Sequence, residues 1–132
     1  MSSDPGDMLD VLVTRAILHA ERLADAGDAG APAAYETVSR YEEALAAVHP
    51  ADDVEGAVAR VGAITAALRA GQRQRAHDLA RRYEADPALS DARREEIAEA
   101  FDRLAPGNIG RPDVLRRNRA LVRSHFTEGK AA

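Results

Sequence analysis

The residues best placed to do chemistry in this 132-residue chain lie near its end, where three arginines recur at helical spacing. Arg116, Arg119 and Arg123 fall on one ridge of a helix that we expect to open at Pro112, because steps of three and four residues return to the same face. A row of guanidinium groups suits phosphates and carboxylates. The ridge predicts a surface for nucleic acid or for an acidic partner segment, or else an internal contact with the acidic N-terminal half of the chain.

A histidine on the same predicted helix offers a catalytic alternative. The segment from Arg119 to His125 matches a loose pattern in which an arginine is followed some residues later by a histidine. In this it resembles the HEPN-type ribonucleases, which are small helical bundles that dimerise. The resemblance implies that the two side chains meet at a dimer cleft for phosphodiester cleavage. Ala120 stands where that family usually has a polar residue, and the competing interpretation is a buried, structural His125.

The remaining histidines and acids predict no metal and no cofactor. His19, His49 and His77 are scattered, and none has a carboxylate or second histidine at the spacing of helical metal sites. Adjacent acids such as Glu42 and Glu43 diverge on a helix, so we expect solvated faces or caps rather than an acid–base pair. Because there is no cysteine, disulfides, thiolate zinc sites and cysteine nucleophiles are excluded. We assign no catalytic residue and favour a non-enzymatic function.

Composition predicts the fold class. There are 29 alanines and only 4 % aromatic residues, which favours helices that cross closely over small side chains. Few residues favour strands, so we expect an all-α protein. No apolar run approaches the roughly 18 residues that span a bilayer, and the acidic start is unlike a secretion signal. We therefore expect a cytoplasmic protein without membrane contact, and 17 arginines against one lysine suggest a GC-rich, bacterial genome.

Charge is unevenly distributed along the chain, whose net charge is −4. Residues 1–59 carry three basic and 12 acidic side chains, whereas residues 60–132 carry 15 basic and 10 acidic ones. Such a chain can neutralise itself within the fold, or it can join copies head to tail.

The pattern of apolar residues predicts five or six antiparallel helices in one domain, residues 7–128, arranged as hairpins or as a compact bundle. We expect disorder over residues 1–6 and fraying over residues 129–132. The first four helices are expected at 7–26, 33–48, 54–70 and 72–85, the fifth after Ser90 and the sixth from Pro112.

Particular residues predict where helices begin and end. His49 precedes Pro50, and the residue before a proline is pushed out of the α region, so the second helix should end there. Asp52 or Asp53 can cap the third helix, and Ser90 can cap the fifth. The third helix has large apolar residues on one side and glycine or alanine on the other, so both faces can pack and we expect it inside a layered array or bundle.

The stretch over residues 64–87 resembles a tetratricopeptide-repeat hairpin. Gly71 corresponds to the glycine of the turn between the helices, Ala76 and Ala80 to small residues of the second helix, and Pro87 to the closing proline. The first helix lacks the large aromatic residue of that family. The resemblance implies a concave helical surface that binds a peptide or a partner segment.

The first helix has a second apolar feature. Val11 and Leu18 lie opposite its main apolar arc, between Arg15 and Arg22, so the helix has contacts to make on two sides. Another helix of the chain or a second subunit, giving a homodimer, would supply the second contact.

Together these patterns predict a non-catalytic protein-interaction or assembly module that binds an acidic or helical segment of a partner protein. The expected contact residues are Arg116, Arg119 and Arg123 on the ridge, with Val11 and Leu18 on the first helix. Nucleic-acid binding by the basic C-terminal helix and a HEPN-like ribonuclease are the alternatives.

Overall fold

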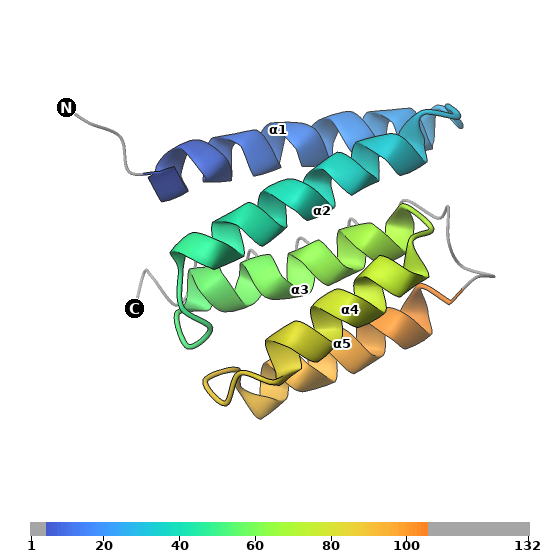
Figure 1. Ribbon diagram of the computed structural model, residues 1–132. Coiled ribbons are helices and arrows are strands. Elements are labelled where there is room, and N and C mark those ends of the chain that lie inside the picture. Colours follow the sequence, from blue (N-terminus) through green and yellow to red (C-terminus); the bar gives the residue numbers. More distant parts are fainter. Residues whose placement is uncertain (1–4, 106–132) are drawn as a thin grey trace.

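The structure, a computed structural model, describes residues 5–105, and this part of the chain consists of five helices without a strand (Figure 1). The prediction of an all-α fold is confirmed for it. The helices are α1 (Pro5–Asp25), α2 (Ala31–Val48), α3 (Val54–Arg69), α4 (Arg73–Glu84) and α5 (Asp91–Arg103).

The predicted helix ends hold at two places and fail in part at a third. The backbone at His49 is extended, with φ −131° and ψ 139°, so α2 ends before Pro50 as predicted. The Ser90 hydroxyl accepts the backbone N–H of Arg93 at 3.2 Å, which confirms it as the cap of α5. Asp53 occupies the N-cap position of α3 but makes no cap hydrogen bond. Its carboxylate lies 3.3 Å from Nδ1 of His49 instead.

The structure describes the chain from Pro5 onward, close to its N-terminus, and as far as residue 105. Pro5 and Gly6, expected in a disordered terminus, form the first turn of α1, where proline fits because its missing N–H would be unpaired anyway. The predicted sixth helix from Pro112 and the expected fraying of residues 129–132 lie outside the described residues.

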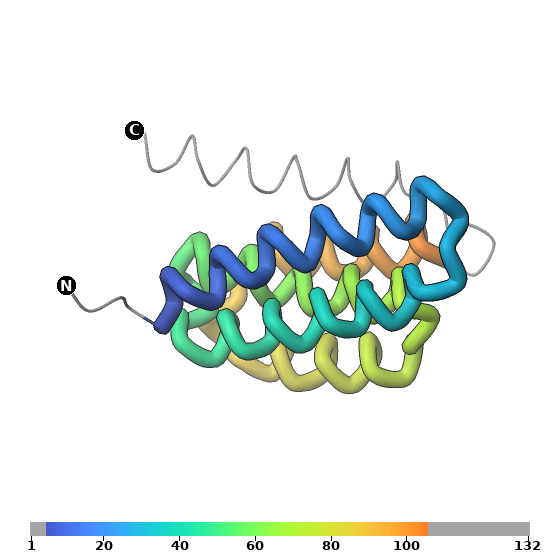
Figure 2. The backbone as a smooth tube through the Cα atoms, turned by 90° about the horizontal axis from the view of Figure 1, so that it is seen from above, coloured from blue at the N-terminus to red at the C-terminus, as the bar shows by residue number. Residues whose placement is uncertain are grey.

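α3 is the central helix of the described bundle. It packs against α2, α4 and α5, whereas α1 packs mainly along α2 (Figure 1). Seen from above, α2 and α4 form one layer and α1, α3 and α5 form the other (Figure 2). Along α3 all but three residues are buried, and large side chains such as Val58, Ile64 and Leu68 have no exposed surface. This burial agrees with the predicted position of the helix inside a layered array or bundle.

Glycines permit a close backbone contact at the start of α3 and a tight turn after its end. A Cβ on Gly56 would lie 2.0 Å from the carbonyl oxygen of Pro50, so the first turn of α3 fits against the preceding loop only without a side chain. Gly71 has φ +76°, a left-handed conformation that glycine adopts at little cost, and it turns the chain from α3 into α4. The predicted turn at Gly71 is therefore present.

Buried polar side chains connect α2 to α3. The Ser39 hydroxyl donates to the carbonyl oxygen of Ala63 at 2.7 Å. Nη2 of Arg69 donates to the Tyr35 hydroxyl at 3.1 Å, and the guanidinium carbon lies 4.7 Å from the centre of that ring. Glu42 has no exposed surface, so the expectation that it lies on a solvated face is wrong. Glu42 lies on the same face of α2 as the buried residues Val38, Ser39 and Leu45, and this face packs on the bundle.

Candidate binding groove between α2 and α4

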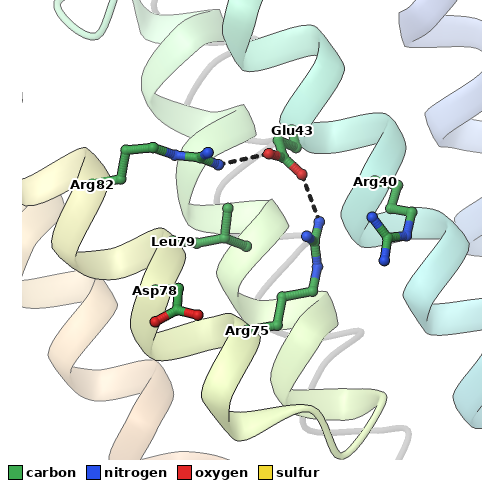
Figure 3. A pocket seen from close by; sticks show the side chains of 6 residues that line it. All are labelled: Arg40, Glu43, Arg75, Asp78, Leu79 and Arg82. Atoms are coloured by element: carbon green, nitrogen blue, oxygen red, sulfur yellow. Dashed lines mark hydrogen bonds and ion pairs between the residues drawn. The ribbon is translucent and has the colours of Figure 1, made fainter.

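A hollow of about 300 Å³ lies between α2 and α4, which share one layer of the bundle (Figure 3). The two lining residues of α2 are three positions apart, and those of α4 follow its first lining residue by three, four and seven positions, so each set shares one face of its helix. The lining residues are Arg40 and Glu43 on α2 and Arg75, Asp78, Leu79 and Arg82 on α4. We call this hollow the α2–α4 groove.

Glu43 is the central residue of the α2–α4 groove. Its Oε1 accepts a hydrogen bond from Nη2 of Arg75 at 2.8 Å, and its Oε2 accepts one from Nη2 of Arg82 at 2.6 Å (Figure 3). The two arginines are seven positions apart on α4, and one carboxylate of α2 therefore contacts two turns of the neighbouring helix. Both bonds are charge-assisted, the stronger kind of hydrogen bond in proteins.

Arg75 is fixed more firmly than the other arginines of the groove. Its Nε donates to Oγ of Ser39 at 3.1 Å, and that hydroxyl in turn donates to the carbonyl oxygen of Ala63 on α3. The side chain of Arg75 is only 18 % exposed. A connected series of hydrogen bonds thus runs from Glu43 through Arg75 into the central helix, and it holds the guanidinium in one orientation.

A second polar bridge closes one end of the groove. Nε2 of Gln72, just before α4, donates to Oε1 of Glu36 at 2.9 Å. The other oxygen of Glu36 accepts hydrogen bonds from both Nε and Nη2 of Arg40, at 3.1 and 3.0 Å. The bridge therefore links the start of α4 to α2 and positions Arg40 beside the groove.

Hydrogen bonds from arginines keep Glu43 of the groove and the nearby Glu36 ionised. Burial alone would raise the pKa of Glu43, but the hydrogen bonds from Arg75 and Arg82 outweigh it and lower that pKa. The bond to Glu43 raises the pKa of Arg82. The hydrogen bond from Arg40 lowers the pKa of Glu36. Because a general base works best with a pKa near the working pH, these carboxylates suit binding rather than proton transfer.

Two arginines of the groove keep donors available to a ligand. The side chains of Arg40 and Arg82 are 61 % and 58 % exposed, and each bonds to a single carboxylate. A guanidinium has five N–H donors, so both retain several that point to solvent or to an incoming acid. Asp78 at the rim is already paired with Arg81 and accepts a hydrogen bond from Gln74. The arrangement offers paired N–H groups for carboxylates or phosphates.

The two predicted contact residues that the structure describes do not line this groove. Val11 and Leu18 belong to α1, where their side chains are 47 % and 51 % exposed, and α1 contributes nothing to the lining of the groove. The arginine ridge at 116, 119 and 123 lies outside the described residues, and so does His125.

The histidines depart from the sequence-based expectation at one position. Nδ1 of His49 lies 3.3 Å from Asp53 and its Nε2 lies 3.5 Å from Glu55, so two carboxylates approach a histidine for which we expect none at the spacing of helical metal sites. The α2–α3 loop brings them together. His77 stacks on Phe101 with ring centres 4.5 Å apart. Over residues 5–105, no group of three or more His, Asp or Glu side chains is arranged to hold a metal.

Fold and site together define the described part of the chain as an all-α helical bundle with a charged groove between two helices of one layer. Comparison with protein-family models, with curated proteins and with solved structures finds no match for this chain. None of the helices between Pro5 and Arg103 is both long and apolar enough to cross a membrane.

Proposed function

We propose that this chain is a protein-interaction module of the cytoplasm whose α2–α4 groove binds an acidic, helical segment of a partner protein. The observation that carries the proposal is the position of two half-exposed arginines, Arg40 and Arg82, beside a carboxylate that already fixes the helices around them. Guanidinium groups on both walls allow carboxylates of one partner helix to be bound from two sides.

The shape of the groove favours a helix as the ligand. Two neighbouring helices of one layer leave a furrow between them, and a third helix can lie in such a furrow with its own side-chain ridge inserted. Leu79 is the one apolar residue of the lining, and at 2 % exposed it lies at the floor beneath the charged side chains. A segment with acids at its edges and small apolar residues between them complements this lining.

The charges of the groove favour protein over nucleic acid. Glu43 and Asp78 are part of the lining, and they would repel a continuous row of phosphates while tolerating separate carboxylates. The resemblance of residues 64–87 to a tetratricopeptide-repeat hairpin supports the same function, because such hairpins stack into surfaces that bind peptide segments. The arginine ridge at 116, 119 and 123 remains a proposed further contact for the same acidic partner.

A titration with a defined acidic helix tests the proposal. The probe is a fluorescein-labelled peptide of repeated Glu and Ala residues with glutamates four positions apart, and binding is followed by fluorescence anisotropy at low salt. We expect the double variant Arg40→Glu/Arg82→Glu to bind at least about tenfold more weakly, because two attractive contacts become repulsive.

Arg103→Glu is the matched control. Arg103 is 40 % exposed on α5 and pairs with Glu99 four positions earlier, as Arg40 pairs with Glu36, but it does not line the groove. We expect this variant to bind within about twofold of the wild type, because solvent and salt screen a charge that lies outside the groove. Equal affinity of the double variant and the control would contradict the proposal.

A further inference from the structure

The outward face of α1 carries a row of exposed apolar side chains. Met8, Val11 and Leu18 are 56 %, 47 % and 51 % exposed, and they are three of the five large apolar residues exposed in the described part of the chain. Single exposed apolar residues are ordinary. These three share one stripe, because Met8 and Val11 are three positions apart and Val11 and Leu18 are seven apart.

The charged residues on the same stripe have no partner within residues 5–105. Asp7, Arg15 and Arg22 are exposed, and none of their side chains forms an ion pair or a hydrogen bond there. Among the arginines of the described residues, only Arg15 and Arg22 lack an ion pair or hydrogen bond there. The other ten all have a hydrogen-bond partner, from Arg40 on α2 to Arg103 on α5.

The order of residues along α1 is complementary to itself when two copies run antiparallel. A two-fold axis that passes between positions 14 and 15 places Val11 opposite Leu18 of the second copy. The same axis places Asp7 opposite Arg22, and it does so twice because of the symmetry. In a parallel arrangement each arginine would instead lie beside the same arginine of the second copy, and these like charges would repel. Both the apolar and the charged residues therefore favour the antiparallel register.

We propose that two copies of this chain associate through the outward faces of α1 in this antiparallel register. The contact is about 30 Å long, from 1.5 Å of rise for each of the 21 residues of α1. A single helix pair falls near or below the lower end of the roughly 1,200–2,000 Å² that specific interfaces bury. The two Arg15 side chains lie close to the axis and repel each other. We therefore expect a weak dimer that forms at high protein concentration and dissociates on dilution.

A pair of charge-reversal variants tests both the interface and its register. Asp7→Arg places two arginine pairs across the axis, and Arg22→Asp places two aspartate pairs there, so each variant alone should self-associate at least about tenfold more weakly than the wild type. In a mixture, the arginine introduced in one variant faces the aspartate introduced in the other, and the unchanged Arg22 of the first faces the unchanged Asp7 of the second. The mixture should therefore associate to within about threefold of the wild type, as measured by sedimentation equilibrium.

Arg15→Leu gives a test in the opposite direction. Removing the repulsion at the axis and adding apolar surface should strengthen the dimer by about tenfold, a result that an unfolded variant would not give. Circular dichroism on each variant checks that the exposed substitutions leave the helices intact. A wild type that stays monomeric at millimolar concentration would overturn the proposal. Failure of the two charge variants to associate with each other, or a monomeric Arg15→Leu variant, would also overturn it.

Discussion

The α2–α4 groove and the outward face of α1 both present arginines and acids, but only the groove pairs them within the described part of the chain. In the groove Glu43 bonds to two arginines of the neighbouring helix, and Arg75 is anchored further to Ser39. On α1, Asp7 and Arg22 have no partner within the described residues. Similar residue types therefore stabilise the fold in one region, whereas in the other no described residue pairs with them.

The pairing also sets how strongly each surface can bind. A long side chain that is already held in place loses little conformational freedom on binding, whereas a free one loses roughly 0.5–1.5 kcal/mol when it is immobilised. The groove is therefore suited to selective binding, while the α1 face is suited to a weak contact that depends on concentration. Matched substitutions in the two regions should differ accordingly in their effects.

The greatest difference is expected between two leucines. Leu79 is 2 % exposed at the floor of the groove and Leu18 is 51 % exposed on α1. Leu79→Ala should lower the free energy of unfolding by about 2–4 kcal/mol, because it removes buried surface and leaves a cavity. Leu18→Ala should change it by less than about 0.5 kcal/mol. Urea unfolding followed by circular dichroism, at a concentration where the chain is monomeric, measures both. A similar loss for Leu18→Ala would mean that the α1 face is part of the fold.

A smaller difference is expected between two acids. Glu43→Gln removes the charge that two arginines share and should cost about 1 kcal/mol of unfolding free energy, since the partners are only partly exposed. Asp7→Asn should cost less than about 0.3 kcal/mol, because no described residue pairs with this carboxylate. The same unfolding measurement applies at low salt. An equal loss of unfolding free energy for the two variants would contradict the claim that only the Glu43 charge is paired within the fold.

The effect of acid pH should be smaller still. The folded-state pKa of Glu43 lies below its unfolded value, so its contribution to stability is complete above the unfolded pKa of about 4.3 and is lost as the pH falls through the folded pKa. The difference in unfolding free energy between the wild type and Glu43→Gln should therefore be constant from pH 7 to about 5 and shrink below that. A difference that grows toward acid pH would contradict the pairing.

Much of the fold follows from local sequence signals. The Ser90 cap, the turn at Gly71 and the end of α2 before Pro50 each depend on residues that are neighbours in sequence, and all three are present in the structure. The capping bond expected from Asp53 fails because the loop brings His49 within reach of the same carboxylate. Local preferences therefore predict where these helices begin and end, whereas the partner of the Asp53 carboxylate depends on the loop around it.

The groove could not be predicted in the same way. Glu43 lies 32 positions from Arg75 and 39 from Arg82, and the three meet only because α2 and α4 both pack on α3. The available signal was a charged stripe on each helix at spacings of three and four. Nothing in the sequence says which two stripes will face each other, so the sequence alone favours the C-terminal ridge as the binding surface.

A ¹⁵N–¹H correlation spectrum of the labelled chain, recorded on dilution and then with the Glu–Ala peptide, distinguishes the two surfaces residue by residue. We predict that dilution from millimolar to micromolar concentration shifts amide signals of α1 around Val11 and Leu18. The peptide should shift signals of α2 and α4 around Glu43 and Arg82 and leave those of α1 unchanged. Shifts of the same residues in both experiments, or peptide shifts outside α2 and α4, would contradict the account of two separate surfaces.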